Sequence, residues 1–194
     1  IGPTDLLLCS VGRQVKRKGH EWFIRNVMPH LASNVHLALG GKGPESDAIG
    51  QASLESGLQR RIHLLGLVAE EKLASLYSGG DLFIMPNIPV QGDMEGFGVV
   101  MLEAGLCGMP SIGTQLEGIQ DVITDGVNGH CVAALDVEGF AEVINRYASA
   151  PDSLNKMSQT ARSHTLETFA WPSVCDEIVT TLNIVIDRKK VSAD

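Results

Sequence analysis

The chain has 194 residues and a formal net charge of −8, with few aromatic side chains. This length suits one compact domain with its own core, and the negative charge argues against a general affinity for nucleic acid or anionic membranes. No apolar run reaches the roughly 18 residues that indicate a transmembrane segment, and the first residues lack the basic region of a signal peptide. We therefore expect a cytoplasmic protein in which any phosphate site is local.

Six short apolar runs predict β-strands, and helical patterns fall between them. The predicted strands are residues 5–11, 34–40, 61–66, 81–86, 109–114 and 129–134. The predicted helices lie within 20–32, 45–56, 69–79 and 97–108, and the tail from residue 136 reads as helical with a break near Trp171-Pro172. Such alternation predicts an α/β, Rossmann-like domain whose six-stranded parallel sheet is covered by helices on both faces. Ligands bind beyond the carboxyl ends of such strands.

Cysteine and histidine spacing does not indicate a metal site or a disulfide framework. The four cysteines are far apart and form no Cys-x-x-Cys pair, so we expect reduced, mostly buried thiols. No metal-binding motif is present, and the histidines are scattered. Three of them lie in strand-like runs, where core or edge positions are commoner than ligand roles: His36, His63 and His130.

Several nucleotide-binding and catalytic motifs are missing. The dehydrogenase pattern GxGxxG fails because Met101 stands where the third glycine is needed after Gly96 and Gly98. The P-loop pattern fails because Lys42 is followed by glycine, and no GxSxG motif supports a serine nucleophile. Hydride transfer and ATP hydrolysis are therefore disfavoured.

A basic loop, "VGRQVKRKG", follows the first predicted strand. Its cations are Arg13, Lys16, Arg17 and Lys18, and Gly12 permits a tight exit from the strand. Arginine and lysine together can hold a diphosphate, the first by its fork of N–H groups and the second as a point charge. A solvated basic turn is the simpler interpretation, but the position at the ligand-binding end of the sheet favours a phosphate site.

Two glutamates bracket a glycine pair in "DMEGFGVVMLEAG". If residues 96–107 are helical, Glu95 and Glu103 lie roughly 12 Å apart along the helix axis. Glycosidase carboxyl groups lie roughly 5–9.5 Å apart, so an acid and base pair on one bond fits poorly. An extended ligand held at both ends fits better. Backbone N–H groups at the helix start suit phosphate or sugar oxygens, and carboxylates suit vicinal hydroxyls.

The ordered motifs "SVGRQVKRKG", "LGGKGP", "LLGLVAEEKLASLYSGGDLFIMPN", "EGFGVVMLEAGLCGMPSIGT" and "EGIQDVITDGVNG" resemble the C-terminal, donor-binding domain of retaining GT-B glycosyltransferases of family 4. The resemblance runs from about residue 5 to 135, and it implies that residues 1–194 form a nucleotide-sugar-binding domain, one half of a GT-B fold. By this resemblance, Arg13 and Lys18 hold the donor diphosphate, and Glu95 contacts the transferred sugar. The loop Gly96, Phe97, Gly98 and Val99 offers backbone N–H groups to sugar and phosphate.

The resemblance also assigns the nucleoside end of the site. Glu103 matches the glutamate that binds the ribose hydroxyls. A segment flanking the base, mainly through its backbone, is Gly66, Leu67 and Val68. Gly40 and Gly41 match a second loop of the nucleotide cleft, and Gly12 opens the first.

The family retains anomeric configuration and needs neither a metal nor a cofactor. The resemblance implies a UDP-, GDP- or ADP-sugar as donor, a hexose-type sugar as the group transferred, and an unidentified acceptor. GT-B enzymes have two such domains, so we expect a missing N-terminal acceptor-binding domain, through which the protein can lie at a membrane. The 194-residue chain should then bind donor weakly and transfer nothing.

Two features of the sequence leave alternatives open. The family often has two glycines where this chain has Glu117-Gly118, which places a third carboxylate near the cleft. An apolar stripe in the tail can pack on the absent domain or on the chain's own sheet: Val174, Ile178, Leu182 and Val185.

Three other functions are alternatives to sugar transfer. A GT-B-related epimerase would need acidic groups and histidines placed for proton abstraction, and the sequence shows no such set. A flavodoxin-like signalling domain is disfavoured by the glutamate pair. A non-catalytic nucleotide-binding or regulatory module remains the main alternative.

Overall fold

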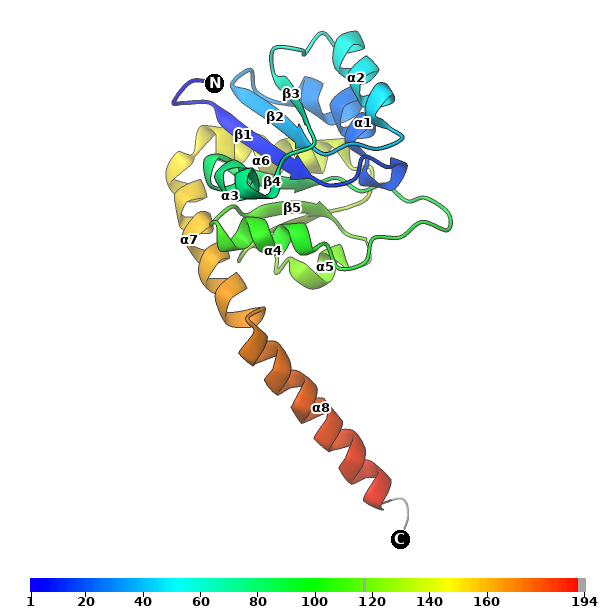
Figure 1. Ribbon diagram of the computed structural model, residues 1–194. Helices are drawn as coiled ribbons and strands as arrows, with labels where there is room; N and C mark the ends of the chain where they lie inside the picture. The colour runs from blue at the N-terminus through cyan, green and yellow to red at the C-terminus, as the bar shows by residue number, and fades with distance from the viewer. Residues whose placement is uncertain (117, 192–194) are drawn as a thin grey trace.

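The computed structural model describes residues 1–116 and 118–191, with side chains described as far as Val185. Its centre is a parallel sheet of six strands in the order β3-β2-β1-β4-β5-β6 (Figure 1). The strands are Leu6–Val11 (β1), Val35–Gly40 (β2), Ile62–Gly66 (β3), Leu82–Met85 (β4), Ser111–Thr114 (β5) and Gly129–Val132 (β6). All six were predicted within two residues at each end, and the α/β fold class is confirmed.

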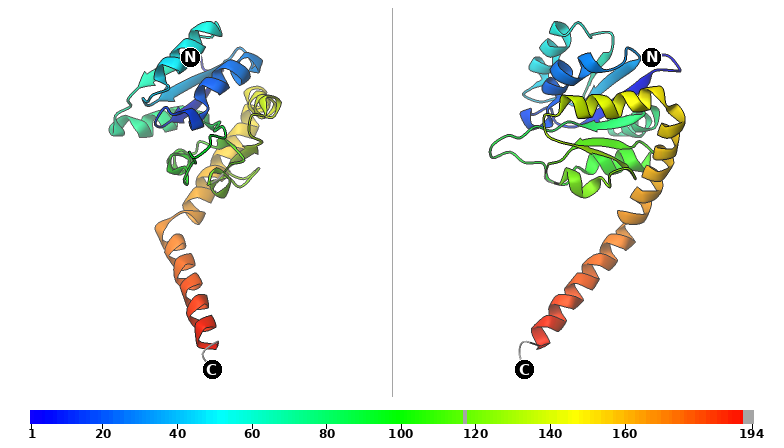
Figure 2. Two further views of the ribbon diagram at one scale, coloured as in Figure 1. Left: turned by 90° about the vertical axis from the view of Figure 1, so that its right-hand side faces the viewer. Right: turned by 180° about the vertical axis from the view of Figure 1, so that it is seen from behind.

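Helices cover both faces of the sheet, as Figure 2 shows from two sides. The first face carries α1 (His20–Trp22), the π-helical η2 (Phe23–Val27), the 3-10 turn η3 (Met28–His30), α2 (Ser46–Glu55) and α6 (Val137–Ser149). The second carries α3 (Glu70–Gly79), α4 (Val99–Leu106) and the four-residue α5 (Ile119–Val122). Side chains of successive residues in a strand point to opposite faces of the sheet and pack in different cores. Leu8 packs in the first core, and Cys9 packs in the second.

The crossover after β1 is less regular than the sequence predicts. Instead of one α-helix over 20–32, the chain forms α1, η2 and η3 in succession. Pro29 explains the irregularity, because proline has no N–H to donate and its ring clashes with the carbonyl one turn earlier. Phe23, Val27 and Leu31 of the predicted apolar face are nevertheless buried.

The start of α4 corrects a second expectation. The helix begins at Val99, after Gly98, whose φ of 70° is left-handed. Glu95 therefore belongs to a loop, and its separation from Glu103 does not follow from helix rise. Glycine tolerates this backbone conformation at little cost, and a Cβ there would also lie 2.7 Å from the Met101 side chain. The end of α4 at Cys107 and Gly108 agrees with the prediction.

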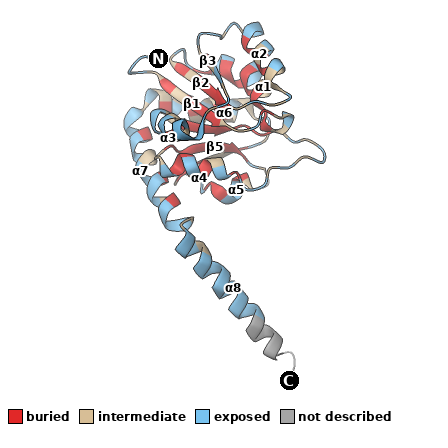
Figure 3. Ribbon diagram, viewed as in Figure 1, coloured by how far each residue is buried: buried red, intermediate tan, exposed pale blue. Residues whose placement is uncertain are grey.

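Three helices form the tail, which breaks at Pro151 as well as at Trp171-Pro172. After α6 come α7 (Pro151–Thr168) and α8 (Trp171–Val191). α7 packs along α4, where the Arg162 guanidinium donates to the Leu106 carbonyl at 2.9 Å. α8 projects away from the domain, and its described side chains are exposed except Val174, which is partly buried (Figure 3). Ile178 and Leu182 are 53% and 55% exposed, so of the two alternatives for this stripe, packing on the chain's own sheet is wrong.

The cysteines and histidines correct one expectation and match another. All four thiols are free, but only Cys9 is buried, whereas Cys175 is exposed. The prediction of mostly buried thiols is therefore wrong. His36 stacks on His63 with ring centroids 5.4 Å apart, at the sheet positions that were expected for them. No helix within the described ranges combines the length and apolarity that a membrane crossing needs.

Candidate functional site at the switch point of the sheet

The site lies where the strand order reverses direction. From β1 the chain proceeds to β2 and β3 on one side, and β4, β5 and β6 extend the other side. The loops that leave β1 and β4 therefore diverge from a common edge and open a crevice between them, which is the usual ligand position in open α/β sheets. The loop after β1, which carries Lys18, and the loop after β4, which carries Glu95, both reach this crevice.

A compact charge cluster joins these two loops. Lys18 Nζ lies 2.7 Å from Glu95 Oε2, and each of these side chains is only 10% exposed. Arg17 reaches the same carboxylate oxygen at 3.6 Å and Asp93 at 3.5 Å. Asn87 Nδ2 also donates to Glu95 Oε2, at 3.1 Å. The sequence predicted that Lys18 and Glu95 share a site, but their direct ion pair was not predicted.

The electrostatics of Glu95 follow from this arrangement. Burial alone would raise the pKa of its carboxyl group, because it disfavours the charged form. The hydrogen bond and charge of Lys18, with smaller effects of Asn87 and Arg17, outweigh burial, and the net pKa is lowered. Glu95 is thus an anion that its neighbours hold in one orientation by one oxygen.

Close backbone packing fixes the position of the basic loop. Gly19 has a φ of 65°, and a Cβ there would lie 2.0 Å from the Pro86 carbonyl oxygen. The Ile88 N–H donates to the Arg17 carbonyl at 2.9 Å. Only glycine permits this approach, which packs the loop after β1 directly against the backbone of the loop after β4. This contact brings Lys18 onto Glu95.

Three buried polar atoms around the cluster have no hydrogen-bond partner in the described structure. They are Arg17 Nε, His20 Nδ1 and Asn87 Oδ1. His20 follows Gly19, and its Nε2 lies 3.0 Å from the Ser10 hydroxyl. Burial, and then the charge of Lys18, lower the pKa of His20 to about 4, so the ring is neutral at pH 7. Unpaired buried polar atoms are rare in proteins and mark places where water or a ligand completes the network.

Next to the charge cluster lie four glycines whose backbones pack together, Gly12, Gly40, Gly41 and Gly66, and we call them the glycine shelf. The Gly12 N–H donates to Gly40 at 3.0 Å, and the Gly41 N–H donates to Gly66 at 2.7 Å. A Cβ at Gly41 would lie 1.9 Å from the Gly12 carbonyl oxygen, so the two loops touch through their backbones. The Lys18 side chain passes over Gly12, since a Cβ at Gly12 would lie 3.9 Å from Lys18 Nζ.

Two adjoining hollows extend from this shelf. The first, of about 290 Å³, is lined by residues that include Arg13, Gly41, Leu67 and Val68. The second, of about 540 Å³, lies between α3 and α4, and we call it the Glu103 hollow. It is lined by Val68, Glu70, Leu73, Ala74, Tyr77, Glu103, Leu106 and Cys107. Val68 and Leu73 line both hollows, so the surface is continuous from Arg13 to Glu103.

The loop before α4 contacts the tail through the Phe97 side chain and contacts Gly118 through the Gly96 backbone. Phe97 makes an edge contact with Phe169, with ring centroids 5.9 Å apart, so its side chain is directed toward the tail. A Cβ at Gly118 would lie 1.8 Å from the Gly96 carbonyl oxygen, whereas the side of Gly96 where its own Cβ would stand is open. Glu117 lies outside the described residues, and its expected influence on the cleft stays a prediction.

Sequence reasoning missed three residues of this site. Arg17 was seen only as one member of a basic run, and Asn87 was not singled out. Tyr77 donates its hydroxyl to Glu103 Oε2 at 2.9 Å from a position 26 residues away. Nothing in the local spacing of these residues signals the contacts, because they arise where separate loops or helices meet. Among the described residues, no three His, Cys, Asp or Glu side chains gather as a metal site requires.

Comparisons with known proteins bear on the fold and the family of the chain. The fold matches Anabaena HepE, crystallised with UDP, with a TM-score of 0.80 over 93% of this chain and 49% of that one, at 23% identity. An uncharacterized glycosyltransferase of Methanocaldococcus jannaschii is 26% identical over 189 residues, which cover 96% of this chain and 47% of the relative. The GDP-mannose-dependent alpha-(1-6)-phosphatidylinositol monomannoside mannosyltransferase of Mycolicibacterium smegmatis is 27% identical over 177 residues, 88% of this chain and 46% of the relative.

The chain thus spans about half the length of these two curated relatives. The family Glycosyl transferases group 1 matches residues 5–150, which include every strand of the sheet and all the site residues described above except Phe169. The chain therefore belongs to the Glycosyl transferases group 1 family.

Proposed function

We propose that this chain is the donor-binding, C-terminal half of a retaining, metal-independent glycosyltransferase of family 4. It binds a nucleotide-diphospho-sugar, and the whole protein transfers a hexose-type sugar to an acceptor. The observation that carries the proposal is the ion pair between Lys18 and Glu95 at the switch point of the sheet. One loop there supplies cations for phosphates, and the other supplies a carboxylate for sugar hydroxyls.

At the reacting end, Lys18 and Arg13 hold the diphosphate. As the bond between the anomeric carbon and the diphosphate oxygen breaks, the electron pair leaves with the diphosphate. Positive charge fixed in advance stabilises that leaving group and usually contributes the largest catalytic effect. Glu95 accepts hydrogen bonds from the transferred sugar, and the backbone of Gly96, Phe97, Gly98 and Val99 faces sugar and phosphate.

At the nucleoside end, Glu103 accepts from the ribose hydroxyls within the hollow between α3 and α4. Gly66, Leu67 and Val68 flank the base, and Gly40 and Gly41 line the cleft beside them. The continuity of the two hollows through Val68 supports this assignment, because a nucleotide places its base, ribose and diphosphate in a row.

Metal independence is supported by the cations that the loop after β1 provides. Arg13, Arg17 and Lys18 supply the positive charge that a divalent ion gives to a diphosphate in a metal-dependent enzyme. We propose no cofactor, a cytoplasmic location and an N-terminal partner domain that selects the acceptor and can bring the protein to a membrane. The M. smegmatis relative uses GDP-mannose and HepE binds UDP, so the base is best determined by experiment.

Isothermal titration calorimetry with UDP, GDP, ADP and their hexose conjugates tests the proposal. We expect the 194-residue chain to bind one nucleotide series, and we expect Arg13→Ala and Glu103→Ala to weaken that binding. His30→Gln, an exposed change on the far side of the first helix layer, should leave binding intact. No binding to any of the nucleotides by folded chain would refute the donor site, and sugar transfer by this chain alone would refute its dependence on a second domain.

A further inference from the structure

Tyr77 lies beneath the Glu103 hollow and links its two helical walls. Its hydroxyl donates to Glu103 Oε2 at 2.9 Å, which joins α3 to α4. The tyrosine is only 3% exposed. Its ring makes an edge contact with Phe83 of β4, with centroids 6.1 Å apart and planes at 61°. The donor atom is therefore fixed by packing on the sheet.

Glu103 has the opposite character. It is an exposed residue on the surface of α4, and a glutamate in such a position ordinarily samples many rotamers. Fixing such a long side chain on ligand binding loses more entropy than fixing most others. The bond to a rigid tyrosine restricts this freedom before any ligand arrives, and a receptor group held in advance binds more tightly and selectively.

The hydrogen bond also determines which part of the carboxylate is presented. Tyr77 engages Oε2, and within the described residues no side chain donates to Oε1. Burial, and then the bond to Glu103, raise the pKa of Tyr77 far above its ordinary value. The phenol therefore keeps its proton at neutral pH and donates it in a hydrogen bond to Glu103 Oε2.

We propose that Tyr77 is a positioning residue that gives the site its selectivity for ribose over deoxyribose. By holding Glu103 through one oxygen, it directs the other toward the ribose hydroxyls. This inference rests on the proposed donor site and adds a determinant that neither residue spacing nor the family match assigns. Loss of the bond should weaken recognition of the hydroxyls while contacts with the base and the phosphates persist.

The test compares the affinity of the preferred nucleoside diphosphate with those of its 2′-deoxy and 3′-deoxy analogues, by calorimetry. We expect Tyr77→Phe to lower the ratio of ribo to deoxy affinity by about three- to tenfold, the range of the net contribution of one ordinary hydrogen bond. Affinity for the deoxy analogues should change less than about twofold. A ratio that stays the same or rises in Tyr77→Phe would overturn the inference.

Tyr147→Phe is a matched control. Tyr147 is the other tyrosine of the chain, and it is likewise buried, with its hydroxyl bonded to His130 Nε2 at 2.8 Å. It packs in the core on the first face of the sheet. Both substitutions remove a buried phenol hydroxyl, but only Tyr77→Phe should change ribose selectivity. An equal change in Tyr147→Phe would assign the effect to general loosening and overturn the inference.

A double-mutant cycle distinguishes positioning from a direct contact. In the Glu103→Ala background, Tyr77→Phe should leave the ribo-to-deoxy ratio unchanged, because the group that it positions is gone. A full effect in that background would overturn the inference. If the wild-type chain binds the nucleotide without preferring ribose, this inference fails while the donor site stands. If it binds no nucleotide, both fail together.

Discussion

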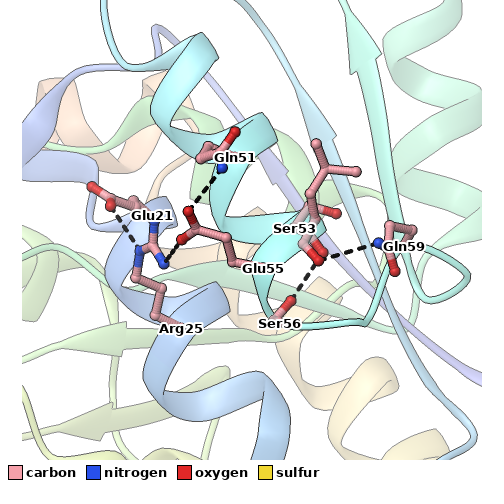
Figure 4. A network of polar contacts seen from close by, with 8 residues as sticks. Glu21, Arg25, Gln51, Ser53, Glu55, Ser56 and Gln59 are labelled. Atoms are coloured by element: carbon pink, nitrogen blue, oxygen red, sulfur yellow. Dashed lines mark hydrogen bonds and ion pairs between the residues drawn. The ribbon is translucent and has the colours of Figure 1, made fainter.

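Two clusters of opposite charges in this protein have similar chemistry and different surroundings. One joins Lys18, Arg17 and Glu95 at the carboxyl ends of β1 and β4. The other lies on the outside of the first helix layer, where Arg25 sits between Glu21 and Glu55 and Gln51 donates to Glu55 at 2.8 Å (Figure 4). The side chains of the outer cluster are 37–49% exposed, against 10–21% for the inner three.

The difference in burial and in unpaired polar atoms favours the inner cluster as the candidate ligand site. In the outer cluster, the hydrogen bonds that Arg25 donates to Glu21 and Glu55 raise the pKa of Arg25, and the bonds that Glu55 accepts from Gln51 and then Arg25 lower the pKa of Glu55. Water reaches these groups and can complete their hydrogen bonding. Around the inner cluster, buried donors and acceptors stay unpaired. Charge that is buried and incompletely satisfied is a feature of functional sites, whereas exposed pairs contribute little.

The largest expected effect is that of Lys18→Met. It removes the main partner of a nearly buried carboxylate, and breaking such a pair from one side lowers the free energy of unfolding by about 3–4 kcal/mol. Arg17 and Asn87 stay near Glu95 but cannot replace a 2.7 Å contact. Urea denaturation at pH 7 measures the change. Arg25→Met in the outer cluster is the control, and equal losses in both variants would show that burial does not separate the clusters.

His20, which lies beside the inner cluster, should make the free energy of unfolding depend on pH. Its pKa is about 4 in the folded protein against an ordinary value of 6.5. Between these values the unfolded chain binds the proton more readily, so stability falls as pH falls from 6.5 toward 4. The loss should reach about 2 kcal/mol at pH 5. Urea midpoints at pH 5 and pH 8 measure it.

The matched variants for this prediction are His20→Gln and His30→Gln. Glutamine at position 20 does not titrate and keeps a polar group near the Ser10 hydroxyl, so the dependence on pH above 5 should flatten. His30 is exposed, and its replacement should leave the dependence as in the wild type. A wild-type slope retained in His20→Gln would contradict the assignment to His20.

Glu95→Gln should have a smaller effect than the two losses of stability above, and the effect should be a gain, namely in the affinity for the nucleoside diphosphate. The carboxylate occupies Lys18 and repels an incoming diphosphate, so its neutralisation should raise the affinity for the nucleoside diphosphate about three- to tenfold. The extra affinity of the nucleotide-sugar over the nucleotide should fall, because a sugar contact is lost. Calorimetry with both ligands measures the two changes. Weaker diphosphate binding would contradict competition between Glu95 and the phosphates for Lys18.

The strands and their parallel arrangement were predictable from the sequence because each strand is a short apolar run, and runs buried on both faces stand out from helices. The start of α4 was not. Residues 97–100 are apolar and read as helical, but the left-handed backbone of Gly98 ends the loop there. α5 was missed because four residues contain too little periodicity to show.

Four charged residues of the candidate site could be proposed from the sequence because they stand in ordered motifs, three in loops that follow strands and Glu103 in the helix after them. Their mutual contacts could not, since Lys18 and Glu95 are 77 positions apart and meet only through the close approach of Gly19 to Pro86. Tyr77 carries no local signal at all, because its neighbours in α3 show only an ordinary amphipathic pattern. Contacts between separate loops and helices are tertiary, and residue spacing along one segment does not encode them.

The smallest expected effect is that of Glu55→Gln in the outer cluster. The substitution removes a charge from an exposed pair while keeping the size of the side chain, and Arg25 keeps its bond to Glu21 at 2.8 Å. The midpoint temperature of thermal unfolding at pH 7 should change by less than about 2 °C, because solvent screens exposed ion pairs. Glu95→Gln is the inner counterpart and should shift the midpoint more, since Lys18 then stays charged with fewer partners. If Glu55→Gln destabilised the chain as much as Glu95→Gln, the outer cluster would be structural, and exposure would no longer separate the two.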